Sequence, residues 1–433
     1  MSDLFAVKDG ELFFKEGVPG LSQQILCLPA VITLFILGCG GIKMAVERIR
    51  EADMYARIAG ATLLPVVDAS AGISRIRQVP GQFTPCTKER TADCYTASLS
   101  ASYEIDFWGK NASASESALA LAQSSRLDQL IVTLTITADV ATAYFSIVGL
   151  RDRLAIARNN LENANHLQGN IQRRFDHGLA TALDLAQQKR IVANFLSAIP
   201  PLELKLRQQT NALAILVGQM PGSLHIQEET GGISGIASPA VTPGLPSELL
   251  ERRPDIQSAE ARLIAANADI NKACAALFPS ISLTMVGGFA STALSSLLLP
   301  ESAFFSLGSS LLQPIFRGEA LAGELKYREA RYNELLHEFH KTVIAAFSDV
   351  ENALAATTQT LAEENARQEV GQEAKNAYEL SQKRFDAGLI DIDTTLNAER
   401  TLFSANDALI QAKLSHLQAL VSLSKALGGG WRN

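Results

Sequence analysis

The feature that most constrains this chain is an internal repeat. Residues 172–179 read QRRFDHGL, and residues 382–389 read QKRFDAGL, 210 positions further on. A solenoid repeats every 20 to 50 residues or so, which is far shorter than this spacing. Because the spacing is close to half of the 433 residues, it predicts a duplicated domain whose two halves share one design.

Each half contains two long segments rich in alanine and leucine, which we expect to be helical. They are residues 112–175, 181–218, 320–385 and 391–427. In the third segment, apolar residues recur every seven positions with a second apolar residue four positions after each, the pattern of a coiled-coil seam. The seam residues are Tyr332, Leu336, Phe339, Val343, Ala346, Val350 and Ala353. A helical run of about 65 residues extends on the order of 100 Å, longer than a globular domain requires.

The two RFDxGL motifs lie where one long helix must turn into the next. Glycine supplies the positive φ that ends many helices, so Gly178 and Gly388 predict the tips of two helical hairpins. Leu179 and Leu389 follow the glycines. Each leucine either packs under its own turn or stays exposed for a partner, and both alternatives remain open.

Strict alternation of polar and apolar residues marks two further segments, Thr96–Tyr103 and Ser280–Met285. This period of two is typical of strands. Candidate partner strands cover residues 64–76 and 304–316. The sequence therefore predicts two strand hairpins, at about residues 63–108 and 278–316.

The strand pattern has two interpretations. Small polar residues on one face and apolar residues on the other suit a membrane barrel with a wet lumen, but an amphipathic sheet packed on a core shows the same alternation. In the barrel interpretation, four strands are too few, because the smallest outer-membrane barrels have about eight. Three chains would supply roughly twelve.

Charge and motif content exclude several functional classes. A formal net charge of −7 lacks the basic excess of a nucleic-acid-binding protein. The sequence has no phosphate loop, GxSxG elbow or CxxC pair, so we expect no cofactor and no catalytic residue. Glu334, His337 and His340 have helical spacing that could hold a metal, but without an HExxH motif a solvated helix edge explains them. We expect neither a metal site nor an enzyme.

Two cysteines, Cys86 and Cys94, bracket a short polar stretch. They are either free thiols or a disulfide, depending on the compartment. In the barrel interpretation the stretch is an exterior loop, where we expect a disulfide. Residues 25–39 form the most apolar run but are too short to span a membrane as a helix. Since the preceding stretch carries Asp3, Asp9, Glu11 and Glu16 in place of a short basic region, we do not expect lipidation at Cys39.

Several segments resemble, in order, the outer-membrane efflux channel proteins, the TolC-like and OprM-like group that serves resistance-nodulation-division pumps. They are ATLLPVVDASAGISR near 61, SASYEIDFWGK near 100, LPSELLERRPDIQSAEARLIAANADINKA from 245, LFPSISL at 277, LQPIFRGEALAGEL at 312 and SKALGGGW near the end. The resemblance covers roughly residues 42–433.

The resemblance implies an α+β membrane protein of the bacterial outer membrane that extends into the periplasm. It implies a homotrimer with a twelve-stranded β-barrel in the lipid of the outer membrane and a periplasmic α-barrel of long helical hairpins. The hairpin tips, here Gly178, Leu179, Gly388 and Leu389, would dock with a membrane-fusion adaptor. An inner-membrane transporter would expel substrates through the shared duct.

The resemblance also implies an acidic gate in the second hairpin, six and nine positions after the tip glycine. Those positions are Thr394 and Asn397 in this chain. The gate candidates are instead the neighbouring acids, with the arginines four residues before each tip glycine: Asp391, Asp393, Asp184, Arg384 and Arg174. An arginine can bridge two carboxylates. Alternatively, these acids are solvated residues at a helix start, where negative charge is favoured.

These patterns divide the chain into an atypical N-terminal segment (1–41), a first repeat (42–230), a linker (231–245) and a second repeat (246–433). The N-terminal segment departs from the usual start of the family, so truncation or a disrupted reading frame is one expectation. We expect a passive export conduit. The alternative is a periplasmic coiled-coil scaffold that forms no pore.

Overall fold

The computed structural model describes residues 5–8, 11–14, 39–77, 91–224, 226, 232–236, 238 and 251–429. The chain forms two compact units. The first combines residues 1–46, 129–254 and 343–433, and the second combines residues 47–128 and 255–342. Each unit therefore draws on both halves of the sequence. The predicted boundaries at 42, 231 and 246 concern the duplication and stay predictions.

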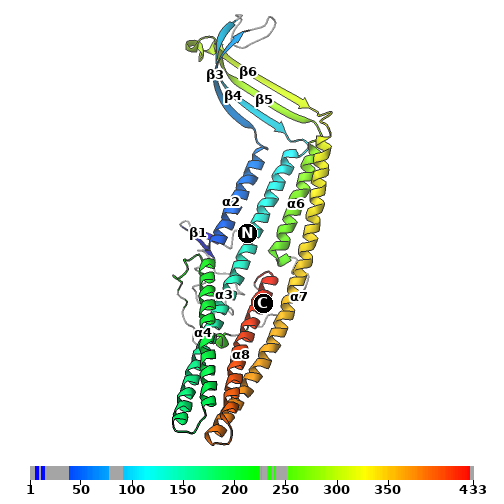
Figure 1. The fold of residues 1–433 in the computed structure, drawn as a ribbon. Helices are drawn as coiled ribbons and strands as arrows, with labels where there is room; N and C mark the ends of the chain where they lie inside the picture. The colour runs from blue at the N-terminus through cyan, green and yellow to red at the C-terminus, as the bar shows by residue number, and fades with distance from the viewer. Residues whose placement is uncertain are drawn as a thin grey trace. The chain divides into compact units, whose positions relative to one another are not determined.

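The four predicted long helices are present (Figure 1). They are α3 (Lys110–Asp176), α4 (Ala182–Leu216), α7 (Ala320–Asp386) and α8 (Ile392–Ala426). The first and third have 67 residues each, and the second and fourth have 35 each. The predicted seam of α7 is buried in its later part, where Ala346, Val350 and Ala353 are only 1%, 7% and 7% exposed, and half-buried at the four earlier positions. The duplicated helical plan is confirmed.

The sequence patterns miss two shorter helices, α2 (Gly40–Ala61) and α6 (Pro254–Ala275). Helix α6 begins at Pro254, and proline is favoured in the first turn of a helix because an N–H at that position would have no partner within the helix. In the second unit, small residues let α2 approach α3, where Ala56 packs on Ala118 and Ala122. Helix α6 binds α3 through Arg262, whose Nη2 lies 2.8 Å from Oδ2 of Asp128.

The four predicted strands are also present and form one antiparallel sheet in the order β3-β4-β5-β6. They are β3 (Val66–Arg77), β4 (Thr91–Ile105), β5 (Ser280–Ser291) and β6 (Ala303–Leu312). The prediction for residues 304–316 was too long, since the strand ends before Pro314. Proline has no N–H to donate to a ladder. A separate antiparallel pair, β1 (Phe5–Lys8) and β2 (Glu11–Phe14), was not predicted.

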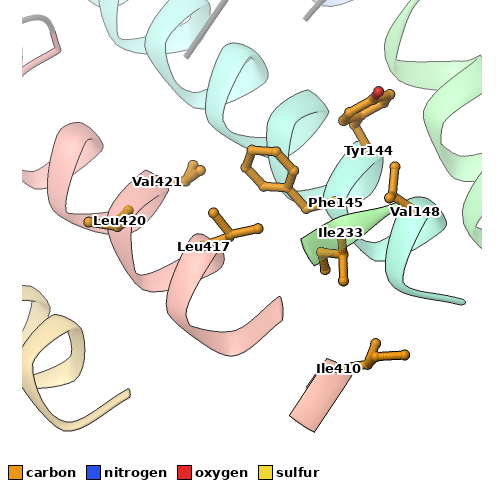
Figure 2. Close-up of a cluster of buried hydrophobic side chains, with 8 residues drawn as sticks. All are labelled: Tyr144, Phe145, Val148, Ile233, Ile410, Leu417, Leu420 and Val421. Atoms are coloured by element: carbon orange, nitrogen blue, oxygen red, sulfur yellow. The ribbon is translucent and has the colours of Figure 1, made fainter. Parts of the chain in front are cut away.

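The main apolar core of the first unit lies where α3, α8 and the single turn η1 (Ile233–Gly235) meet (Figure 2). Its members are Tyr144, Phe145, Val148, Ile233, Ile410, Leu417, Leu420 and Val421. Ile233 is fully buried, and its N–H donates to the Asp152 carboxylate at 2.7 Å. This bond fixes the turn on α3.

Helix α3 is, among the described residues, the one helix long and apolar enough to cross a membrane by length and composition. That property is weak evidence, because the core helix of any large protein can share it. The apolar residues of α3 supply much of the core in Figure 2.

Arg253 ties three segments of the first unit together. Its Nη1 donates to the carbonyl oxygen of Ala426, near the end of α8, at 3.1 Å, and to that of Ala346 in α7 at 3.3 Å. Its Nη2 lies 3.1 Å from Oδ2 of Asp349. The last carbonyls of a helix have no partner within the helix and favour a nearby cation. Arg253 is 9% exposed, so its bonds to the two carbonyl oxygens are shielded from water, whereas the Asp349 side chain is 56% exposed.

We predict that Arg253→Met lowers the free energy of unfolding by about 3 kcal/mol, because it leaves buried acceptors without a donor. Chemical unfolding in detergent measures the change. Arg50→Met is the matched control, since Arg50 pairs with Glu47 on an exposed surface and such pairs contribute less than about 1 kcal/mol. Equal midpoints for the two variants would contradict a structural role for Arg253.

Candidate functional site in the sheet and the helical tips

The four-stranded sheet has two chemically different faces. Side chains alternate between the faces along each strand, and the register joins residues of one kind across all four strands. The apolar face carries Val67, Ala69, Ala71, Ile73, Leu99, Ala101, Tyr103, Ile281, Leu283, Met285, Phe305, Leu307 and Leu311. The opposite face carries mostly small polar residues: Asp68, Ser70, Ser74, Thr96, Ser98, Ser100, Ser102, Ser282, Thr284, Ser306 and Ser310.

No described part of the chain covers the apolar face at Ile73, Phe305 and Leu307, which are 73%, 84% and 73% exposed. An amphipathic sheet packed on its own core would bury such residues, so the packed-sheet interpretation is wrong. An exposed apolar face is typical of the strands of a membrane β-barrel, whose outer face contacts lipid.

The polar face is joined by hydroxyl groups across neighbouring strands. Ser70 and Ser98 have their oxygens 3.0 Å apart, and Ser282 and Ser310 have theirs 2.7 Å apart. Such cross-strand pairs satisfy polar groups and help to set the register. In the described part of the chain, the outer edges of β3 and β6 have no partner strand.

Both predicted hairpin tips are present in the first unit. Gly178 follows α3 and Gly388 follows α7, each with a φ of +72°. In the first tip the N–H of Leu179 donates to the carbonyl of Arg174 at 2.7 Å. The second tip repeats this six-residue closure, which is typical of a glycine-ended helix. The RFDxGL motif thus makes the same turn twice.

The leucines of the tips do not pack under their turns. Leu179 is 72% exposed and Leu389 is 74% exposed. Exposed leucines at a helical tip suit contact with a partner. Their role in adaptor docking stays a prediction.

Asp184, a gate candidate, takes part in capping α4. Thr181 is the N-cap residue: its hydroxyl accepts a bond from the N–H of Asp184 at 3.2 Å, and its own N–H donates to the Asp184 carboxylate at 2.7 Å. These Thr181 bonds hold the pKa of Asp184 below its usual range, with the Arg174 charge as a smaller cause. The reciprocal pair is a capping box.

Asp391, a second gate candidate, is the N-cap residue of α8. Its Oδ1 accepts from the N–H of Thr394 at 3.0 Å and from the Thr394 hydroxyl at 2.5 Å. These bonds lower the pKa of Asp391, so it carries a charge at neutral pH. The two tips therefore use the same residue pair in reverse order. The segments TALD and DIDT contain this capping signal, which the sequence analysis overlooked.

The remaining gate candidates are all exposed: Asp393, Arg384 and Arg174. The guanidinium of Arg174 lies over the ring of Phe385, 5.2 Å from its centre. This contact joins α3 to α7 beside the tips. The proposed bridge from arginine to two carboxylates stays a prediction.

Cys94 is disulfide-bonded and buried. Cys86 lies outside the described residues, so the pairing of these two cysteines stays a prediction. Cys39 and Cys274 are free thiols.

Glu334, considered above as a metal ligand, forms an ion pair with Arg331 at 2.6 Å. The described residues contain no cluster of three metal-ligating side chains.

Residues 41–219 and 245–429 match the outer membrane efflux protein family. The chain belongs to this family. It is therefore an outer-membrane channel component of a tripartite efflux or export pump, with a part that extends into the periplasm, and it is not an enzyme. The family match, like the fold, occurs twice along the chain.

Relatives of known role agree with this assignment. The chain is 38% identical to the pyoverdine export outer membrane protein OpmQ of Pseudomonas aeruginosa, covering 94% of this chain and 86% of OpmQ. It is 33% identical to the toluene efflux pump outer membrane protein TtgC of Pseudomonas putida, covering 87% and 77%.

Solved structures of related channels have the same fold. The outer-membrane channel OprN superposes with a TM-score of 0.86 at 26% identity, over 97% of this chain and 94% of OprN. VceC from Vibrio cholerae gives a TM-score of 0.83 at 25% identity, over 93% and 97%. The expected α+β membrane fold, with long helices and four antiparallel strands, is confirmed.

We predict that two changes at Asp391 separate its capping role from a role in the gate. Asp391→Asn keeps an oxygen acceptor for the N–H of Thr394 and removes the charge, whereas Asp391→Ala removes both. We expect the thermal unfolding midpoint to fall in the alanine variant and to be retained in the asparagine variant. Single-channel recording then reports the charge: wild-type cation selectivity in Asp391→Asn would remove Asp391 from the gate.

Proposed function

We propose that three copies of this chain close their sheets into one barrel of roughly twelve strands around a shared pore. The observation that carries the proposal is the sheet itself. Its apolar face is exposed and its two edge strands, β3 and β6, have no partner among the described residues. Lipid cannot satisfy free backbone N–H and C=O groups, so the edges require strands from identical neighbours.

In such a barrel the apolar face meets lipid and the serine-rich face lines the lumen. Hydroxyl groups and a ring of Asp68 side chains would then contact the passing solute. OpmQ is named for pyoverdine and TtgC for toluene, two very different small molecules. We therefore infer a passive duct for small organic solutes, in which the inner-membrane transporter makes the selection.

The helical tips would serve two purposes in the trimer. Leu179 and Leu389 offer exposed apolar contacts to a periplasmic adaptor. Asp391 and Asp393 of the second hairpin, with Asp184 of the first, would form rings of three carboxylates if they face the axis. Capping does not prevent this, because the capping bonds keep Asp184 and Asp391 ionised.

The alternative of a periplasmic scaffold without a pore leaves the sheet unexplained. A coiled-coil scaffold needs the long helices but has no use for exposed leucine and phenylalanine side chains on strands. Those side chains would promote aggregation in water. A membrane position explains them.

We predict a trimer that conducts ions. The mass of the protein in detergent should equal three chains, and the purified protein should give discrete conductance steps in planar bilayers. A stable monomer or dimer with intact strand signal would refute the shared barrel. A trimer that never conducts would favour the scaffold.

We further predict that Leu179→Asp with Leu389→Asp abolishes efflux in cells that carry the adaptor and the pump, because a charge in an apolar contact is costly. The yield of trimer should not change. Leu204→Asp is the matched control, since Leu204 is 58% exposed on α4 away from the tip. Normal efflux by the double tip variant would argue against the docking site.

A further inference from the structure

One face of α8 turns toward the first hairpin. Thr395, Glu399 and Phe403 follow one another at four-residue spacing, so they share a face of the helix. They are 5%, 3% and 9% exposed. The ring of Phe403 contacts that of Phe195 on α4, edge to face, with centres 5.2 Å apart. Phe403 therefore lies in the contact between the two hairpins, and Glu399 is one helical turn away on the same face.

Some buried positions of the second hairpin are polar where their counterparts in the first are apolar. A shift of 210 residues relates Ser381 and Thr395 of the second hairpin to Ile171 and Leu185 of the first, and all four are buried. The hydroxyl of Thr395 has no hydrogen-bond partner, which carries a desolvation cost. The two hairpins thus bury different polar groups, because the first has Gln188, 0% exposed, where the second has Ala398.

Of Thr395, Glu399 and Phe403, only Glu399 can ionise. Burial raises the pKa of its carboxyl from 4.5 to about 7, since a charge in apolar surroundings is disfavoured. Within the described residues, Glu399 forms no ion pair. The charged residues at this level of the four helices are exposed, except for the half-buried Asp184 on α4: His166, Arg173 and Arg174 on α3, Lys189 and Arg190 on α4, Lys375, Glu379, Lys383 and Arg384 on α7, and Asp393 and Arg400 on α8.

We propose that the α4–α8 contact is a proton-dependent latch between the two hairpins, held by Glu399 as a neutral carboxylic acid and loosened when Glu399 ionises. On ionisation the proton passes to water, and the carboxylate gains hydration only if α8 moves away from α4. The proposal rests on the proposed function, because movement of the second hairpin would change the width of the duct at its tips.

The direction of the pH effect follows from the two states. In the latched state the carboxyl keeps its proton up to about pH 7, whereas an exposed carboxyl in the released state loses it near 4.5. Between these values the ratio of latched to released protein falls by up to about tenfold per pH unit as the pH rises. Below this window the latch is fully stabilised, and above it the ratio no longer changes.

The closing experiment compares wild type with Glu399→Gln and Glu379→Gln in planar bilayers, with the tip side titrated from about pH 5 to about pH 8. We expect the resting conductance of wild type to rise with pH. Glu399→Gln should stay at the low-pH level throughout, because an amide cannot ionise. Glu379→Gln alters an exposed carboxylate on α7 and should keep the wild-type profile.

A second readout does not depend on a pore. Amide hydrogen exchange over residues 392–403, compared at matched intrinsic rates, should lose protection as pH rises in wild type but not in Glu399→Gln. If Glu399→Gln matches wild type in both pH profiles, the latch is wrong. If no variant conducts, the proposed function fails, and exchange alone then decides the latch. Flat exchange in wild type overturns it.

Discussion

The sheet imposes the constraint on which the rest of this structure depends. Its four strands present phenylalanine, leucine and isoleucine on one face and serine on the other, while the edges of β3 and β6 have no partner strand in the described part of the chain. Contact with water is unfavourable for the apolar face, and contact with lipid is unfavourable for the serine-rich face. In a bilayer, the backbone groups at the two edges must also be paired, because lipid cannot bond to them. A closed barrel shared between copies answers all three conditions.

The long helices must also be held at fixed positions relative to one another along their axes. Seams of alanine and leucine bury surface well but specify the relative position of long helices weakly, and buried polar groups often supply that specificity. Here Arg153 binds Asp407 at 2.6 Å, joining α3 to α8. Lys413 binds Glu364 at 3.0 Å, joining α8 to α7, with both side chains only 15% exposed. With Arg253, these pairs fix the relative levels of α3, α7 and α8.

The two halves show which properties a duplication preserves. Helix lengths, the tip glycines and the six-residue closure are the same in both halves, because they depend on backbone geometry that any related sequence must keep. Side chains have diverged around this backbone. Thr181 caps α4 and Asp391 caps α8, and the buried polar residues differ, with Gln188 in the first hairpin and Thr395 and Glu399 in the second.

The sequence by itself determined the elements and their plan. Periodicity gave the four long helices and the four strands to within a few residues, and the glycines of the RFDxGL motifs placed both tips. These are local properties, set by spacing along the chain and by the φ that glycine permits. The error at the end of β6 was local too, because Pro314 was overlooked.

Only the tertiary structure decided how these elements are used. Alternation could not show whether the apolar face of the sheet was covered, because burial depends on which distant segments pack against it. For the same reason, the sequence could not reveal that Arg253 binds the end of α8 or that Glu399 is buried beside the contact with α4. Both contacts join residues far apart in the sequence, so no local pattern could predict them.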